Sequence, residues 1–337
     1  MPMHLVVSDF GCSLGKKSER LLVRQKGAVL SETPFRDIQQ ITISSRGISL
    51  STDVIQECSE HGIQINFLSF SGQPYAKLAS PNLTGTVVTR REQLLAYNDQ
   101  RGVFLAKAFI EGKLKNQANV LKYFAKYRRT TDKEKYTQIY QGIGAIDRIR
   151  GQLQGLTGTR IDDLRGQLFA MEGKGAHHYW DTFELLIGDR VDFPGRERRG
   201  ASDPLNSALN YGYGILYTQM EGAVMLAGLD PYAGFLHTDR PGKPSLVLDM
   251  VEEFRPVVVD RTVIVMVTKG PGLEMEEDKL TEGTRKELAR RVLERLDGEE
   301  TFEGKKHKLR NIIQMQARRV ASYLRGEGKY RPFTGSW

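Results

Sequence analysis

The hydrophobic pattern of this chain changes once, between Ser80 and Thr86, and this change constrains the fold more than any other feature. Before it, short apolar runs alternate with polar residues and end at Gly-containing turns, which is typical of half-buried strands. After it, apolar residues recur at the spacing of amphipathic helices. Pro81 and Gly85 are typical of a linker. The sequence therefore predicts an α+β protein with a small N-terminal β-rich domain at residues 1–84, a linker at 85–90 and a larger, all-helical domain at 91–337.

Short strands and one helix account for the N-terminal domain. Strands are predicted at residues 4–8, 20–24, 28–30, 38–44, 63–70 and 75–78, and Lys26-Gly27 is typical of a hairpin turn. Ser51 or Thr52 caps the helix, which ends at Gly62. This pattern favours a small β-sandwich or split barrel. It contains no catalytic group of residues, and its histidines are interpreted as structural.

The excess positive charge lies in the second part of the chain. The formal net charge of +8 comes from 49 Lys or Arg and 41 Asp or Glu, whereas residues 1–84 hold eight basic and seven acidic residues, a net charge of +1. A net positive charge favours a polyanion as partner. A nucleic acid would therefore bind mainly the helical domain.

Missing motifs exclude several classes of protein. The chain has no HExxH of a zinc protease, no Walker loop for a nucleotide and no GxSxG of an esterase. Two cysteines, Cys12 and Cys58, make neither a disulfide framework nor a zinc site. The N-terminus lacks the apolar run of a signal peptide, and no stretch approaches the ~20 apolar residues of a membrane span. We therefore expect a cytoplasmic protein without membrane contact.

Two basic stretches of the helical domain are candidates for binding nucleic-acid phosphates. One is helical, with interleaved aromatic residues, and contains Lys113, Lys115, Lys122, Lys126, Arg128 and Arg129. Its alternative is a solvated helix face. The other is the loop at 189–200, which contains Arg190, Arg196, Arg198 and Arg199. Its alternative is an exposed loop with incidental charge, but the loop is the better DNA-binding candidate.

Glu172, His237 and a group of acids near residue 250 lie in apolar surroundings, far apart in the sequence. Burying such groups without partners is costly, so they are usually paired, hydrogen-bonded or bound to metal. A carboxylate–His–carboxylate set suits Mg²⁺ or Mn²⁺. His177 and His178 point in different directions on a helix, so at most one of them could join Glu172.

The acids near residue 250 lie on a helix predicted at 244–254. Asp249 and Glu252 share one face, which is either solvated or half of a metal site, and either acid or both can be ligands. Glu253 is rotated by about 100° from Glu252 and is expected to meet solvent or Arg255.

Five segments in one order resemble the CRISPR adaptation integrase, the universal metal-dependent nuclease of spacer acquisition. They are Met171-Glu172-Gly173, Asp203-Pro204-Leu205-Asn206, Leu209-Asn210-Tyr211-Gly212-Tyr213, Gly234-Phe235-Leu236-His237 and the run from Asp249 to Pro256. The resemblance covers essentially the whole chain. It implies that Glu172, His237 and Glu252 are the catalytic metal ligands for Mg²⁺ or Mn²⁺. Asp249 would then stand behind the ligands and orient a metal-bound water or a nearby Lys or Arg.

This resemblance also implies the reaction and the partners. The helical domain would insert short DNA fragments into a CRISPR array by transesterification, and would appear as a DNA endonuclease when water is the nucleophile. The partners would be double-stranded DNA, a second copy bound through the β-rich domain, and a small second CRISPR adaptation protein that bridges two dimers. The alternative is a non-catalytic DNA-binding scaffold whose acidic cluster is structural.

The C-terminal part gives one conflict between propensity and resemblance. Residues 257–267 are rich in β-branched residues, which favours a strand, whereas the resemblance implies a helix, and we follow the resemblance. Amphipathic helices are predicted at 281–296 and 305–324. Residues 326–337 contain little core-forming sequence and are expected to be mobile or bound to a partner.

Overall fold

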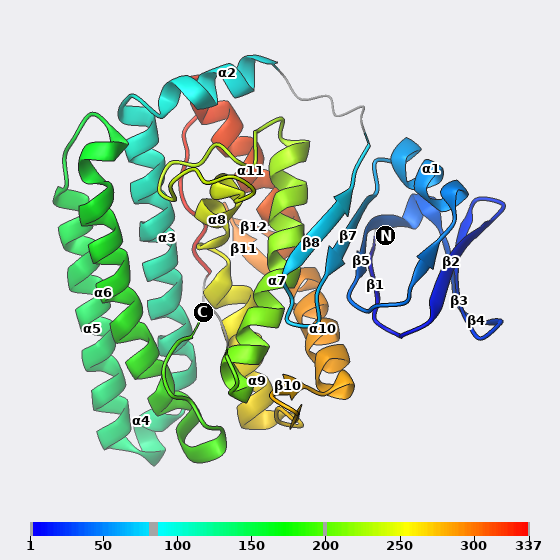
Figure 1. Cartoon of the computed structure of the whole chain (residues 1–337). Helices are drawn as coiled ribbons and strands as arrows, with labels where there is room; N and C mark the ends of the chain where they lie inside the picture. The colour runs from blue at the N-terminus through cyan, green and yellow to red at the C-terminus, as the bar shows by residue number, and fades with distance from the viewer. Residues whose placement is uncertain (1–2, 81–86, 198–200, 336–337) are drawn as a thin grey trace.

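The computed structural model describes residues 3–80, 87–197 and 201–335, and separates strands from long helices (Figure 1). Strands dominate up to residue 78 and helices dominate the rest, so the predicted α+β class is confirmed. The prediction of an all-helical second region is wrong in one respect. Two short antiparallel hairpins lie in it, β9–β10 (Met275–Glu276 and Lys279–Leu280) and β11–β12 (Glu299–Phe302 and Lys305–Lys308).

Two four-stranded sheets form the N-terminal region. One has the order β1–β5–β7–β8, with bounds Met3–Val7, Ile38–Ile43, Gln64–Leu68 and Pro74–Leu78. The other has the order β4–β3–β2–β6, with bounds Ala28–Pro34, Arg20–Gln25, Cys12–Lys17 and Ser49–Leu50. Buried residues of both sheets, including Leu14 and Ile41, share one apolar core, as in the predicted sandwich. Helix α1 (Thr52–Glu60) begins where the Ser51 hydroxyl accepts from the Val54 amide.

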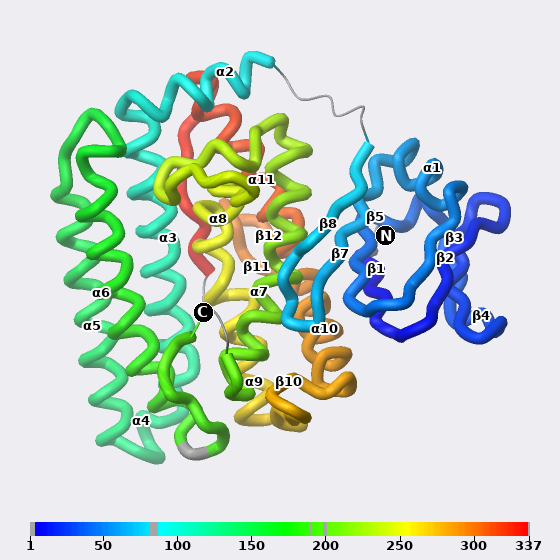
Figure 2. Tube along the Cα trace, viewed as in Figure 1, coloured from blue at the N-terminus to red at the C-terminus, as the bar shows by residue number. Residues whose placement is uncertain are grey.

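Three long helices form one side of the second region. They are α3 (Gln100–Ala125), α5 (Lys133–Gly155) and α6 (Ile161–Ile187), with the short α4 (Arg128–Thr131) between the first two. They lie side by side in Figures 1 and 2. Helix α2 (Val87–Ala96) precedes them, so residues 87–90 of the predicted linker are helical, and residues 85–86 lie outside the described ranges.

Helix α7 lies between these helices and the N-terminal sheets (Figure 1). The remaining elements are α7 (Pro204–Leu226), α8 (Ser245–Val251), a π-helix (Pro256–Asp260), α9 (Arg261–Lys269), α10 (Glu282–Asp297) and α11 (Leu309–Leu324). The helix expected at 257–267 is confirmed, because its valines are buried among other helices and this packing overrides strand propensity. The helix predicted at 244–254 ends earlier, at Val251. Residues 305–308 form β12, so the helix predicted from 305 begins only at Leu309.

The C-terminal segment is part of the core, contrary to the expectation from its composition. Tyr330 and Phe333 are buried, and the Phe333 ring stacks on Phe254 with 5.2 Å between centroids. Tyr330 and Phe333 help to anchor a segment whose other described residues are mostly polar or glycine. In the ranges that the structure describes, no helix is long and apolar enough to cross a membrane.

Candidate active site

A buried lysine joins two of the predicted site residues. Lys113 of α3 contacts Glu172 of α6 through its Nζ, and the same Nζ lies 2.7 Å from Glu252 Oε2, just after α8. Lys113 and Glu252 are 5% and 4% exposed. Burial alone would lower the pKa of Lys113, but the two carboxylates outweigh it and hold that pKa above its usual value. The prediction that Lys113 lies on a DNA-binding surface strip is therefore wrong, because its ammonium is turned inward.

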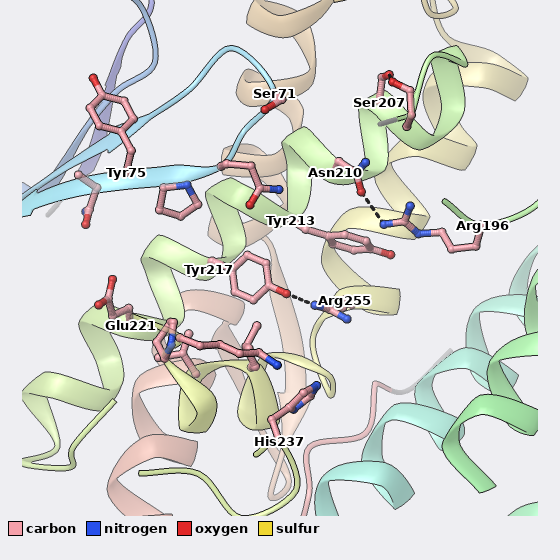
Figure 3. A pocket seen from close by; sticks show the side chains of 18 of the residues that line it. Ser71, Tyr75, Arg196, Ser207, Asn210, Tyr213, Tyr217, Glu221, His237 and Arg255 are labelled. Atoms are coloured by element: carbon pink, nitrogen blue, oxygen red, sulfur yellow. Dashed lines mark hydrogen bonds between the residues drawn. The ribbon is translucent and has the colours of Figure 1, made fainter. Parts of the chain in front are cut away.

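Arg255 holds the other oxygen of Glu252. Its guanidinium lies 2.5 Å from Glu252 Oε1 and donates to the Tyr217 hydroxyl. It also lies over the rings of Tyr213 and Tyr217, at 4.9 and 5.3 Å from their centroids. Figure 3 shows both tyrosines extending from α7 toward Arg255. Glu252 is thus fixed between two cations, one from α3 and one from its own turn.

His237 is oriented by Asp249. Its Nδ1 lies 2.7 Å from Asp249 Oδ1, and the backbone amides of Phe235, Leu236 and His237 donate to the same carboxylate at 2.7–2.9 Å. Asp249 is fully buried, and these contacts use both of its oxygens. A carboxylate partner makes Nδ1 the donor, which leaves Nε2 as the ligand nitrogen. Asp249 therefore orients His237 in this structure.

The loop before His237 requires a glycine. A Cβ on Gly234 would lie 2.6 Å from the Ser245 Cβ and 3.0 Å from Asp249 Oδ2. Any side chain would push the loop away from α8 and pull its amides off Asp249. The position of His237 therefore depends on Gly234 as well as on Asp249.

Lys113, His237 and Arg255 line one cavity of about 1230 Å³. Residues 70–77 of the N-terminal region form one wall, and α6, α7 and the segment at 240–248 form the others. Among the described residues, no three His, Cys, Asp or Glu side chains lie close enough to form a ready metal site. Lys113 occupies the space between the two carboxylates, and Glu252 Oε2 makes this ion pair but no hydrogen bond. The space between Glu172 and Glu252 therefore accepts a cation.

Of the two arginines that the structure describes in the loop at 189–200, Arg196 lines the cavity and Arg190 does not. Arg196 donates to Asn206 Oδ1 and Asn210 Oδ1 at 2.8 and 2.6 Å, and lies 5.4 Å from the centroid of the Tyr213 ring. Arg190 is exposed and donates to a backbone carbonyl. Arg198 and Arg199 lie outside the described residues. His177 is exposed and pairs with Asp181 on the outer face of α6, so it does not join Glu172.

Sequence reasoning missed Asp260, which anchors the cavity wall. The hydroxyls of Tyr179 and Tyr213 donate to its carboxylate at 2.8 and 2.5 Å. Burial raises the pKa of Asp260 to about 6. Through Tyr213 it supports the ring on which Arg196 and Arg255 lie. A lone aspartate at the end of a buried valine run was the signal that could have identified it.

Glu253 is placed differently from its prediction. It is fully buried, and it accepts from the Tyr330 hydroxyl, the Phe333 amide and Gln316 instead of meeting solvent or Arg255. Burial raises its pKa to about 8. The prediction assumed a helix through residue 254. Helix α8 ends at Val251, but Glu252 keeps an αR backbone. The prediction failed because α11 and the C-terminal residues, rather than solvent, cover the side that Glu253 faces.

Comparison with known proteins decides the family. Residues 5–294 match the profile of the family described as CRISPR associated protein Cas1. The chain belongs to the Cas1 family. The resemblance inferred from the five sequence segments is thereby confirmed.

One relative and two solved structures illustrate the extent of the similarity. A CRISPR-associated endonuclease Cas1 of Archaeoglobus fulgidus is 38% identical over 99% of this chain and 100% of its own. A casposase bound to integration product has a TM-score of 0.81 at 24% identity, covering 98% of this chain and 93% of the other. A Cas6-RT-Cas1–Cas2 complex gives a TM-score of 0.80 at 18% identity, over 100% of this chain and 36% of the other. The Cas1 fold therefore spans the whole of this chain.

Proposed function

We propose that this member of a family of CRISPR-associated endonucleases is a metal-dependent DNA integrase, which inserts short DNA fragments into a CRISPR array by transesterification. The observation that carries the proposal is the convergence of Glu172 and Glu252 on the buried ammonium of Lys113, which lines the same cavity as the oriented His237. Two carboxylates and a neutral imidazole are a donor set suited to Mg²⁺ or Mn²⁺. When bound, such an ion activates an attacking hydroxyl and offsets charge on the transferring phosphate.

The protein's own groups prepare this chemistry. Asp249 holds the Nδ1–H of His237, which fixes the neutral tautomer that binds metal through Nε2. Arg255 holds Glu252 in place. Lys113 balances the two carboxylates and would compete with a metal for them. The buried lysine at the centre of the site supports a role for that position in binding a cation.

Basic and aromatic side chains make up much of the cavity lining, which also includes the acids Glu221, Asp260 and Asp278. Basic side chains line the cavity at Lys77, Arg196, Arg240, Lys243 and Arg255, and aromatic rings at Phe70, Tyr75, Trp180, Tyr213, Tyr217 and Tyr232. Cations bind phosphates, and rings stack with unpaired bases. This lining supports a substrate DNA end that lies in the cavity and reaches Lys113, His237 and Arg255. In this proposal, Arg190, Arg198 and Arg199 would make further contacts with DNA phosphates.

The proposed partners follow from family membership. Double-stranded DNA would be the substrate, the β-rich region would form a homodimer, and a small second CRISPR adaptation protein would bridge two dimers. The fold similarity to a solved Cas1–Cas2 assembly supports the last of these.

A strand-transfer assay tests the proposed function. A labelled DNA fragment should be joined to a supercoiled target with Mg²⁺ or Mn²⁺, and EDTA should abolish joining. Glu172→Gln keeps the side-chain volume but removes one anionic ligand, so it should lower the rate at least roughly 100-fold while leaving DNA binding intact. DNA binding by the unmodified chain without any metal-dependent joining or cleavage would instead favour a non-catalytic scaffold.

A further inference from the structure

The described C-terminal residues pack against α3 and the turn that carries Glu252, on the side away from the cavity. We call residues 330–335 the C-terminal strap. In Figure 1 the chain that follows α11, in red, passes down between α3 and α8. Tyr330 and Phe333 bury their rings against Phe109 and Phe254, with centroid distances of 5.7 and 5.2 Å. The Asn119 amide donates to the Gly335 carbonyl at 2.7 Å and holds the end of the strap on α3.

Asn116 ties the strap to two other segments. It lies on α3 one turn after Lys113 and is fully buried. Its Nδ2 donates to the Glu253 and Phe333 carbonyls at 2.7 and 2.9 Å, and its Oδ1 accepts from the Gly335 amide at 2.8 Å. A single side-chain amide thereby joins α3, the turn that carries Glu252, and the strap.

Glu253 completes the connection from the other side. Its carboxylate accepts from the Phe333 amide at 2.9 Å, from Gln316 Nε2 at 3.2 Å and from the Tyr330 hydroxyl. All three donors come from the strap or from α11. The next position back along the chain is Glu252, so these bonds fix the backbone from which Glu252 projects toward Lys113.

Close packing leaves little freedom between these segments. A Cβ on Gly112 of α3 would lie 2.8 Å from both Glu253 Cγ and Pro332 Cβ. The three segments therefore meet at a backbone surface of α3, directly beside Lys113. A buried ion pair is favourable only while its geometry is kept, so the Lys113–Glu252 pair depends on this spacing.

We propose that the C-terminal strap is a positioning device: through Asn116 and Glu253 it sets the distance between α3 and the turn at residues 252–254, and so holds Glu252 where it binds a cation. The inference rests on the proposed function, because the metal whose binding the strap would affect is part of that proposal. Neither Asn116 nor Glu253 lines the cavity. Both are positioning residues, and the strap should affect metal affinity without contacting DNA.

A pair of substitutions at one position provides the test. Gln at 253 can accept from the Phe333 amide and Gln316 through its amide oxygen, and donate to the Tyr330 hydroxyl oxygen. Ala can do none of these. In the purified full chain, Glu253→Ala should weaken Mn²⁺ binding, measured by electron paramagnetic resonance of free Mn²⁺, by roughly 10-fold or more. Glu253→Gln should bind Mn²⁺ as the unmodified chain does, and the KM for DNA should be unchanged in both variants.

Tyr330→Phe is the milder second variant. It keeps the ring against Phe109 and removes only the hydroxyl that donates to Glu253. Tyr330→Phe should weaken Mn²⁺ binding, by a smaller factor than Glu253→Ala. If Glu253→Ala does not fold, the Mn²⁺ affinity of Tyr330→Phe tests the role of the strap. Far-UV circular dichroism at the assay temperature checks that each variant is folded.

The outcomes separate the inference from the proposed function. If Glu253→Ala and Tyr330→Phe lose thermal stability but bind Mn²⁺ as tightly as the unmodified chain, the strap only packs the core and the inference is wrong. If Mn²⁺ binding weakens as expected but no variant, nor the unmodified chain, joins DNA, the inference stands and the integrase proposal fails. An unmodified chain that binds no Mn²⁺ overturns both.

Discussion

At the residue scale, the candidate site consists of buried polar groups that hold one another in place. Asp249 fixes His237, Arg255 fixes Glu252, and Lys113 lies between Glu172 and Glu252. Removing one partner from such a set leaves the other buried without compensation, which costs more than the pair itself contributes. Single substitutions should therefore act on geometry as well as on charge.

Substitutions at Asp249 and Glu252 should differ in kind. Glu252→Gln removes a proposed ligand and should eliminate strand transfer. Asp249→Asn puts an NH₂ group against the backbone amides that donate to Asp249, so His237 should be misoriented and activity should fall roughly 10–100-fold without disappearing. Mn²⁺ titration of both variants checks this. Loss of metal binding in Asp249→Asn with full binding in Glu252→Gln would show that the ligand had been wrongly assigned.

His4 should make stability pH-dependent. Burial first, and Arg310 second, lower its pKa from 6.5 to about 3, so the unfolded state binds the extra proton between these values. With respect to His4, the free energy of unfolding therefore has its full value above pH 6.5 and decreases as the pH falls toward 3. Urea unfolding across this range should show the decline, and His4→Gln, neutral throughout, should flatten it. Equal slopes for the two proteins would contradict the assignment to His4.

At the residue scale, the sequence indicates individual candidate ligands only where a motif is available. Glu172, His237 and Glu252 came from the resemblance, since geometry on the predicted helix left Asp249 and Glu252 equivalent. Lys113 was misread because a lysine on an amphipathic helix is usually solvated. Its inward position depends on Glu172, 59 residues further along the chain, and no local pattern records that contact.

At the element scale, the segment from α8 to α9 determines the shape of the site. Its valines favour a strand, yet residues 256–269 form a π-helix and then α9, because most of its valines are buried in the helical core. The π-helical turn ends at Asp260, whose carboxylate then points at Tyr179 and Tyr213. Local propensity could not predict this, since the deciding contacts come from α6 and α7. The helix at 257–267 was predicted correctly only because the family resemblance was preferred to the β propensity of its valines.

The two tyrosines on Asp260 form a matched pair for mutagenesis. Tyr179→Phe and Tyr213→Phe each remove one hydrogen bond to a buried carboxylate, so each should lower the free energy of unfolding by about 1.5–3 kcal/mol. Only Tyr213 lies under Arg196 and Arg255 at the cavity. DNA binding, measured by fluorescence anisotropy, should therefore weaken in Tyr213→Phe alone. Equal weakening in both would mean that the effect is general destabilisation.

At the scale of the whole molecule, the two regions meet along α7. Gly72 of the β7–β8 turn lies against α7, where a Cβ on Gly214 would come within 1.6 Å of the Gly72 carbonyl oxygen. Lys77 and Glu221 pair at 2.5 Å on the same interface. This contact closes the cavity, whose lining comes from both regions. The two-part division was predictable from the change in periodicity, but the docking was not, since it depends on two glycines with no local signal.

Gly214→Ala should separate the two regions without unfolding either. The new methyl group cannot fit against the Gly72 backbone, so the N-terminal region should shift away and the cavity should open. Faster proteolysis between the regions and weaker DNA binding are expected. Gly166→Ala, on α6 with nothing near its Cβ position, is the control and should change neither. Normal proteolysis of Gly214→Ala would show that the interface adjusts.

The N-terminal region should form the dimer. It has its own apolar core, and exposed apolar side chains such as Phe10, Val29 and Leu30 lie on it. With a net charge near +1 over residues 1–84, little repulsion opposes association of two copies. Sedimentation of the isolated region should show a dimer at micromolar concentration. A monomer there, with a dimeric full chain, would move the interface to the helical region.

Lys113 also affects how metal affinity should be interpreted. Since the Lys113 ammonium already contacts both Glu172 and Glu252, uptake of Mn²⁺ would replace one cation with another, and a titration would report the difference between two binding free energies. The ammonium offsets part of the repulsion between the two carboxylates. If Lys113 were replaced by an uncharged residue, a metal would bind Glu172 and Glu252 without displacing another cation. Metal binding should then be tighter, and the folded protein without metal should be less stable.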